Sequence, residues 1–288
     1  MGYRLFLSAI IGTFIFVLSS CGPNKPATSG AIPPPAGDSA AMVHYHRANE
    51  YMLLDKWDSA IDGYMLCIKA DSGNWRAYYQ LGGVYQLQGD FQKSLYCFSR
   101  CVELNPEFTL GFFNKSNVED MIGNEKQSLA DLRRSINLKN DFFFAILSIA
   151  RKESAAGKFK EAIQAFDSAI TLRPEYYLAY SMRGSCKFKS GDIQGAIKDF
   201  SSEIELMPTH LMGYVNRAIA FGELKNYQAA INDLSVAIQI DPLWSQSFLY
   251  RGVFYHKVNR RDSGCGDFRM AVNLKNPQAD AYSKEYCK

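Results

Sequence analysis

Residues 75–108 read WRAYYQLGGVYQLQGDFQKSLYCFSRCVELNPEF, and this stretch decides the fold because the chain repeats its pattern. Residues 177–210 read YLAYSMRGSCKFKSGDIQGAIKDFSSEIELMPTH and keep small and bulky residues at the same positions. Both stretches are 34 residues long, and copies of this length follow one another without a gap over residues 41–278. A period of this length is typical of a helix–turn–helix unit that stacks into a solenoid.

Three positions of the repeat keep their character in all seven copies. Positions eight and twenty are always small, and position twenty-four is always large and apolar. Two antiparallel helices pack closely only where small side chains let their backbones approach, and a bulky residue then fills the space beside that contact. Position eight holds Ala48, Gly82, Ser116, Ala150, Gly184, Ala218 and Gly252. Position twenty holds Ala60, Ser94, Ser128, Ala162, Ala196, Ala230 and Gly264. Position twenty-four holds Tyr64, Phe98, Leu132, Phe166, Phe200, Leu234 and Phe268.

Other positions mark where the helices end. Position thirty-two is proline in four copies, and proline is common just past the end of a helix because it cannot continue one. Position fifteen holds Gly, Asn, Asp or Lys, which suits the turn between the two helices of a repeat. The prolines at position thirty-two are Pro106, Pro174, Pro208 and Pro242. The glycines at position fifteen are Gly89, Gly123, Gly157 and Gly191.

On these positions, residues 41–278 resemble the tetratricopeptide-repeat (TPR) family. The resemblance implies an all-α, right-handed α-solenoid of seven repeats, with residues 279–288 as a helix that caps the last one. The expected repeats are 41–74, 75–108, 109–142, 143–176, 177–210, 211–244 and 245–278. Members of the family bind other proteins, so the resemblance implies a binding protein. The sequence contains no recognisable Ser/His/Asp or Cys/His arrangement and no phosphate-binding glycine loop, so we expect neither an enzyme nor a cofactor.

The first forty residues predict export and anchoring. An apolar stretch follows Arg4 and ends in Leu18-Ser19-Ser20-Cys21, as in a secretory signal peptide over residues 1–20. The last four residues resemble a bacterial lipobox of the Bacteroidetes type, which implies that Cys21 is lipidated. Residues 21–40 are rich in Pro, Gly and Ser and are expected to form a flexible tether. We therefore expect a protein anchored by lipid in the bacterial outer membrane, on the periplasmic face because no acidic residue follows Cys21 until Asp38.

The overall charge gives no case for nucleic acid as a partner. The formal net charge is +3, and 47% of the residues are hydrophobic. Nucleic-acid binding calls for a basic face or stripe, which a nearly neutral chain does not provide. A high apolar and aromatic content instead fits a repeat protein in which every unit contributes to one continuous core.

Two cysteines near the end of the chain are candidates for a disulfide. Cys265 falls on the expected last helix of repeat seven and Cys287 in the capping helix. An oxidising compartment would allow this bond, and two free thiols are the alternative. Cys97 and Cys101 share one helix face, but no further ligands complete a tetrahedral site, so no metal is predicted.

Two charged positions change together along the chain. Where position seven is Lys or Arg in repeats three, five, six and seven, position twenty-three is Asp; repeats two and four carry neither charge. This covariation within one chain predicts four ion pairs across the helix pairs. The expected pairs are Lys115–Asp131, Arg183–Asp199, Arg217–Asp233 and Arg251–Asp267.

The family resemblance also implies where a partner binds. In this family the first helices of successive repeats line a concave groove, and positions two, five, six, nine, twelve and thirteen face the ligand. At positions two and five of repeats one to four the residues are Met42, Tyr45, Arg76, Tyr79, Leu110, Phe113, Phe144 and Leu147. Seven of the eight are apolar or aromatic, which suits a peptide or an amphipathic helix, unless some rings pack between repeats instead.

The sequence therefore predicts a lipid-anchored envelope scaffold that binds partner proteins in its groove. Two alternatives stay open: an assembly or piloting lipoprotein of an outer-membrane secretion or pilus machine, and a glycan- or peptidoglycan-associated protein. The oligomeric state is open as well.

Overall fold

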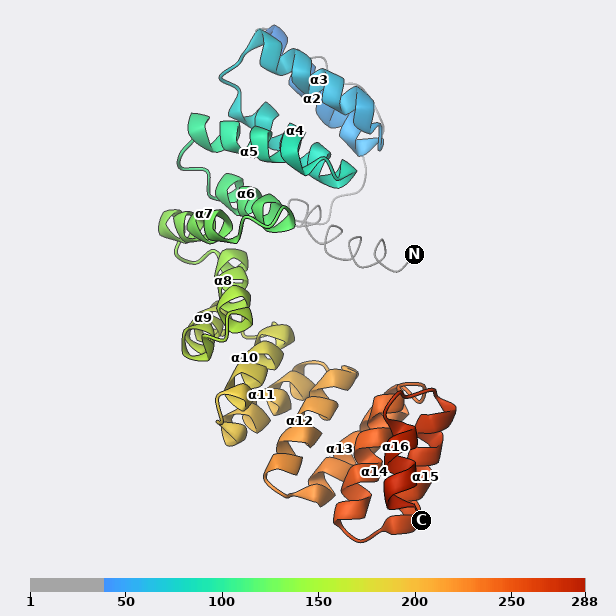
Figure 1. Cartoon of the computed structure of the whole chain (residues 1–288). Coiled ribbons are helices and arrows are strands. Elements are labelled where there is room, and N and C mark those ends of the chain that lie inside the picture. The colour runs from blue at the N-terminus through green and yellow to red at the C-terminus, as the bar shows by residue number, and fades with distance from the viewer. Residues whose placement is uncertain (1–38, 288) are drawn as a thin grey trace, which may run out of the picture. The chain divides into compact units, whose positions relative to one another are not determined.

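The computed structural model describes residues 39–287, and within them the chain consists of fifteen helices and no strand. The helices form seven pairs followed by one further helix (Figure 1). The first helices are α2 (Ala40–Leu53), α4 (Trp75–Gln88), α6 (Thr109–Met121), α8 (Phe143–Ala155), α10 (Tyr177–Lys189), α12 (Leu211–Glu223) and α14 (Ser245–Lys257). The second helices are α3 (Trp57–Ala70), α5 (Phe91–Leu104), α7 (Glu125–Leu138), α9 (Phe159–Leu172), α11 (Ile193–Leu206), α13 (Tyr227–Ile240) and α15 (Arg261–Asn273), and α16 (Ala279–Tyr286) follows them.

Each first helix packs against the second helix of its own repeat and against the second helix of the repeat before it. From α4 onwards, every first helix begins at the residue that opens its 34-residue copy. This succession of helix pairs confirms the predicted α-solenoid, in which each unit contacts its neighbours along the chain.

The glycines at position eight are required because an aromatic ring lies directly against them. A Cβ atom on Gly184 would lie 2.8 Å from Phe200 Cε1, and one on Gly252 would lie 2.7 Å from Phe268 Cε1. Both distances are too short for carbon atoms, so the glycines are required by the packing. Phe200 and Phe268 are themselves buried, as the pattern at position twenty-four predicts.

The turn inside each repeat requires a left-handed backbone at position fifteen. Gly89, Gly123, Gly157 and Gly191 have φ between 74° and 90°. Asp55, Lys225 and Asn259 occupy the same position in the other repeats with φ between 55° and 59°. Glycine adopts this conformation without the steric cost that a Cβ atom brings, which explains its frequency here.

The last helix covers the end of repeat seven. Tyr282 and Tyr286 of α16 place their ring centroids 5.9 and 6.1 Å from that of Phe268, whose side chain is fully buried. Without α16, Phe268 and Ala271 would lose this cover, because no further repeat packs there within the described residues. The helix therefore acts as the cap that a solenoid end requires.

Candidate interaction surface

The structure divides the eight residues predicted for the groove into two groups. Six are half-buried or exposed on the first helices of repeats one to four, where a partner can reach them. These are Met42, Tyr45, Arg76, Tyr79, Leu110 and Phe144. The other two, Phe113 and Leu147, are only 3% and 7% exposed.

Phe113 and Leu147 belong to the core, and their assignment to the ligand-contacting surface was wrong. Phe113 packs with Leu132 of the second helix of its repeat, and its ring centroid lies 5.1 Å from that of Phe142. Leu147 packs with Phe166 in the core of repeat four. Position five turns toward the neighbouring helices in these repeats, so a large apolar residue there fills the space between helices.

Tyr79 is held in place by its neighbours. Its ring centroid lies 4.9 Å from that of Phe108, and its hydroxyl accepts a hydrogen bond of 2.9 Å from Asn114 Nδ2. Burial raises the pKa of Tyr79 to about 12, which the Asn114 hydrogen bond opposes, so the hydroxyl stays protonated at neutral pH. Nearby, the guanidinium of Arg76 lies 4.4 Å from the ring centroid of Trp75, a cation–π contact at an exposed site.

A hollow of about 550 Å³ lies between repeats three and four, and side chains from α6 and α8 form much of its wall. Asn117 and Asp120 come from α6, and Ser148 and Arg151 come from α8. All four occupy positions six, nine or twelve of the repeat, which face the ligand in the groove of the TPR family. A hollow of this size falls in the range of about 300–1,000 Å³ usual for binding pockets.

Charged side chains give this hollow its character. Lys152 and Asp120 form an ion pair across α8 and α6, and Glu153 Oε2 lies 3.1 Å from Lys158 Nζ. Arg151 is exposed, and no acidic residue among residues 39–287 lies in salt-bridge distance of it. Its guanidinium therefore keeps the capacity for a carboxylate or carbonyl oxygen of a partner.

Sequence reasoning concentrated on the apolar residues at positions two and five and missed this polar part. The signal was nonetheless present, because the same resemblance places positions six, nine and twelve in the groove. Read at those positions, Asn117, Ser148 and Arg151 stand out as polar residues beside the aromatic ones.

All four predicted ion pairs are confirmed. Arg183, Arg217 and Arg251 each donate two hydrogen bonds of 2.6–2.9 Å to the paired aspartate, in the two-pronged geometry that suits a guanidinium and a carboxylate. Lys115 Nζ lies 2.9 Å from Asp131 Oδ2. These arginines are therefore engaged in holding the repeats together.

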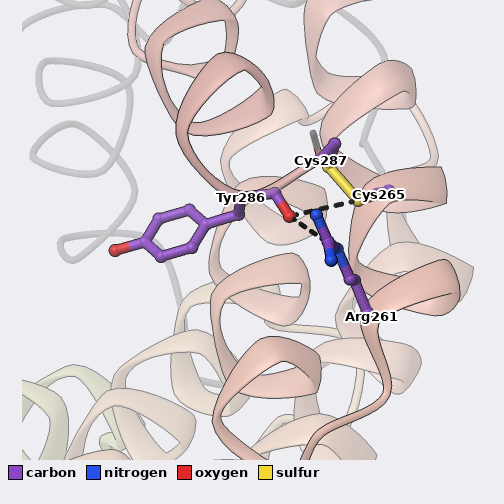
Figure 2. The surroundings of a disulfide bond; sticks show 4 residues. All are labelled: Arg261, Cys265, Tyr286 and Cys287. Carbon is purple, nitrogen blue, oxygen red and sulfur yellow. Dashed lines mark hydrogen bonds between the residues drawn. A yellow bond between two sulfur atoms is a disulfide. The ribbon is translucent and has the colours of Figure 1, made fainter.

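The cysteines near the end of the chain form a disulfide between α15 and the residue that follows α16. Cys265 and Cys287 are bonded, with their Cα atoms 5.6 Å apart, and Figure 2 shows this bond beside Arg261 and Tyr286. Arg261 Nε donates a hydrogen bond of 3.1 Å to the Tyr286 carbonyl oxygen. Both contacts attach the capping helix to repeat seven.

The other described cysteines, Cys67, Cys97, Cys101 and Cys186, are buried free thiols. Burial raises the pKa values of Cys97 and Cys101 to about 12, so both thiols are neutral and unreactive at neutral pH. Residues 39–287 contain no group of three or more His, Cys, Asp and Glu side chains arranged to hold a metal ion.

The same residues include no helix that is both long and apolar enough to cross a membrane. The predicted signal peptide, the lipidation site Cys21 and nearly all of the tether lie outside the described residues.

Comparisons with known proteins agree on the repeats. Residues 75–108 match one family model described as Tetratricopeptide repeat, and residues 147–210 match another with the same description. No curated protein matches the sequence.

Several solved structures share the fold. The C-terminal part of a TPR repeat-containing protein from Cytophaga hutchinsonii is 14% identical with a TM-score of 0.71, over 82% of this chain and 98% of that one. A tetratricopeptide repeat protein from Parabacteroides merdae is 14% identical with a TM-score of 0.60, over 86% and 99% of the two chains. YrrB, described as a TPR protein with an unusual peptide-binding site, is 17% identical with a TM-score of 0.58, over 65% and 97%. At these identities the likeness shows the fold.

Proposed function

We propose that this chain, which consists largely of tetratricopeptide repeats, is a scaffold that binds a segment of a partner protein along its first helices. The observation that carries this proposal is the hollow whose wall includes Asn117 and Asp120 of α6 and Ser148 and Arg151 of α8, at positions six, nine and twelve of the repeat. Six residues at positions two and five of the first helices are also exposed or half-buried. Apolar and aromatic side chains supply contact area, while Arg151 supplies a charged donor for the backbone or a carboxylate of the partner.

The arrangement favours an extended peptide or a single helix as the bound segment. Leu110 and Phe144 offer apolar contacts on α6 and α8, and Asn117 and Ser148 offer hydrogen bonds on the same two helices. A bound segment can therefore bury apolar side chains and satisfy its polar groups on one surface, which both peptide modes require.

Charge-reversing substitutions at exposed positions test this binding. We expect the double variant Arg76→Glu/Arg151→Glu to lose partner binding while keeping its helical circular dichroism and its urea midpoint. The matched control is Lys126→Glu/Lys160→Glu, which makes the same change in charge at exposed positions on the second helices. Binding is read by photocrosslinking in cells from an amino acid placed at Leu110, with Gln164 on α9 as the control position. Equal capture by both double variants, or equal crosslinking from both positions, would contradict the groove.

We also propose that Cys21 is lipidated and holds the scaffold at the periplasmic face of the outer membrane. The support is the apolar stretch that ends in Leu18-Ser19-Ser20-Cys21 and the absence of acidic residues directly after Cys21. Labelled palmitate should enter the wild-type protein and not the Cys21→Ala variant. Protease added to intact cells should leave the protein uncut until the outer membrane is opened; cleavage in intact cells would place it on the cell surface.

A further inference from the structure

In repeats five to seven, one arginine joins three helices. Each Arg at position seven binds the Asp at position twenty-three of its own repeat and an acceptor at position twenty-five of the preceding repeat. Arg217 Nη1 donates to Ser201 Oγ at 3.0 Å, and Arg251 Nη1 donates to Ser235 Oγ at 3.1 Å. Arg183 Nη1 donates a hydrogen bond of 2.6 Å to Asp167 Oδ1. We call these three positions together the junction site.

The junction site of repeat two is apolar at all three positions. Leu81 stands in place of the arginine, Cys97 in place of the aspartate and Met65 in place of the acceptor from the preceding repeat. Leu81 and Cys97 are buried, whereas Met65 is 53% exposed. The pair at positions seven and twenty-three is also uncharged in repeat four, but there Arg133 at position twenty-five lies 3.9 Å from Glu153 Oε1. Repeat two alone among repeats two to seven has no charge at its junction site.

A hollow of about 360 Å³ lies against the junction site of repeat two. Leu81, Cys97 and Met65 line it together with the rings of Tyr78 and Tyr85. Its volume lies at the small end of the range of about 300–1,000 Å³ usual for ligand sites, which suits one or two side chains.

Two large side chains on the second helices line this hollow and are exposed. Met65 of α3 is 53% exposed, and Tyr96 of α5 is 61% exposed. Met and Tyr are common at protein interfaces, because they adapt to a partner or offer a large ring at low entropic cost. Two such residues exposed at one hollow indicate a contact surface.

The charged residues that line the hollow are both lysines, Lys69 and Lys93. Lys93 forms an ion pair with Asp90 at 2.7 Å, in which both side chains are exposed. No acidic residue in the described part of the chain lies in salt-bridge distance of Lys69, and no acidic residue lines the hollow. A basic side chain that enters the hollow would meet two ammonium groups and no carboxylate in its wall, whereas an acidic one would find a counter-ion in Lys69.

We propose that this hollow is a second docking site, which receives a large aliphatic or aromatic side chain of a partner protein flanked by acidic residues. It lies on α3, α4 and α5 and uses second-helix residues, so it is separate from the groove of the first helices. The apolar side chain occupies the hollow against the junction site of repeat two, and the flanking carboxylates contact Lys69 and Lys93.

The test uses a random peptide library displayed on phage and selected against the full chain. The matched variant is Met65→Ser/Leu81→Arg/Cys97→Asp, which gives repeat two the junction residues of repeat six and fills the hollow. Because that variant changes buried positions, Met65→Ser/Tyr96→Ser serves as a second variant at exposed positions. Lys126→Glu, at an exposed position of α7 outside both surfaces, is the control.

We expect the enriched peptides to share a large apolar residue flanked by Asp or Glu. They should bind at least tenfold more weakly to both junction variants and equally well to Lys126→Glu. Enrichment of basic or wholly polar peptides, or equal binding to all variants, would overturn the proposal. Two further outcomes would overturn the proposal. If the wild type binds anionic vesicles and the Met65→Ser/Tyr96→Ser variant does not, the occupant is a membrane surface. If the wild type is a dimer in sedimentation velocity and this variant is a monomer, the occupant is a second copy of the chain.

Discussion

At the scale of single residues, Glu119 of repeat three combines burial with a close second carboxylate. Its side chain lies 3.5 Å from Lys115 Nζ, and the same ammonium group lies 2.9 Å from Asp131. Burial and the neighbouring Asp131 raise the pKa of Glu119 to about 7. The folded chain therefore holds this proton over a pH range in which the unfolded chain releases it.

The consequence is a stability that falls as pH rises. In the unfolded chain Glu119 titrates near pH 4.3, so between about pH 4.5 and 7 the folded state binds more protons and the free energy of unfolding decreases with pH. Glu119→Gln cannot ionise, so we expect it to gain stability relative to wild type over this window, by on the order of 3 kcal/mol at pH 8. Urea unfolding at pH 4.5, 6 and 8 measures the difference. Glu125→Gln, at an exposed position of the same repeat, should follow the wild type; a parallel pH profile for Glu119→Gln would contradict the prediction.

The Arg217–Asp233 pair supports a second prediction at this scale. Both side chains are largely buried, so Asp233→Ala leaves a guanidinium with poor solvation and should cost about 3 kcal/mol of unfolding free energy. Replacing both partners by apolar residues, as Arg217→Leu/Asp233→Cys, should cost about 1 kcal/mol or less. Leu81 and Cys97 show that the same positions accept apolar residues in repeat two. The urea midpoints of the two variants measure this difference. If Arg217→Leu/Asp233→Cys is as unstable as Asp233→Ala, the ion pair itself holds the helices together.

At the scale of elements, the turn inside each repeat offers a matched comparison. Lys225 has φ of 59° and Gly157 has φ of 74° at the same position of two repeats. A left-handed backbone costs a residue with a Cβ atom about 1–2 kcal/mol, a cost that glycine avoids. We expect Lys225→Gly to raise the free energy of unfolding by about 0.5–1 kcal/mol and Gly157→Ala to lower it by about 1 kcal/mol. Lys126→Gly, in the first turn of α7, is the control and should be destabilising, because glycine there only loosens a helix.

The turn also shows why the sequence predicts the elements so closely. Residues at position fifteen, such as Asp55 and Asn259, tolerate the left-handed region or avoid its cost, and their spacing recurs in every copy. Proline at position thirty-two, as in Pro106, follows the end of a second helix in the same way. These signals are local, so the sequence contains what is needed to locate them.

At the scale of the molecule, the repeated pattern predicts the contacts that the repeats share, but it does not predict a contact that only one repeat makes. The ion pairs could be predicted because the two charges are present or absent together in repeats two to seven; in repeat one, Arg47 stands opposite Gly63. Phe113 was misplaced because the family pattern gives position five one role in every copy, whereas in repeat three its ring packs against Leu132 in the core. Glu203 illustrates the same limit: its buried carboxylate lies 2.6 Å from His210 Nδ1, a pairing with no counterpart in the other repeats. Likewise, the junction hollow of repeat two depends on three helices at once.

Because each repeat packs on its neighbours, a defect should act differently in the middle of the solenoid and at its end. Leu132 and Phe268 both fill position twenty-four and are buried, in repeat three and in repeat seven. Truncating either one to alanine removes core packing worth about 2–5 kcal/mol. In Leu132→Ala we expect the repeats on the two sides of repeat three to unfold in separate steps, because the coupling between them passes through the weakened unit.

In Phe268→Ala only the capped end should loosen early, with a small loss of helical signal followed by the main transition. Circular dichroism at 222 nm against urea distinguishes the two cases. Leu132→Ala should show two large steps of unequal amplitude, because two repeats precede repeat three and four repeats with the capping helix follow it. Phe268→Ala should show one small step before a large one. Hydrogen exchange then identifies which helices open in each step. A single transition in both variants, shifted in midpoint with an unchanged slope, would show instead that the seven repeats unfold as one cooperative unit.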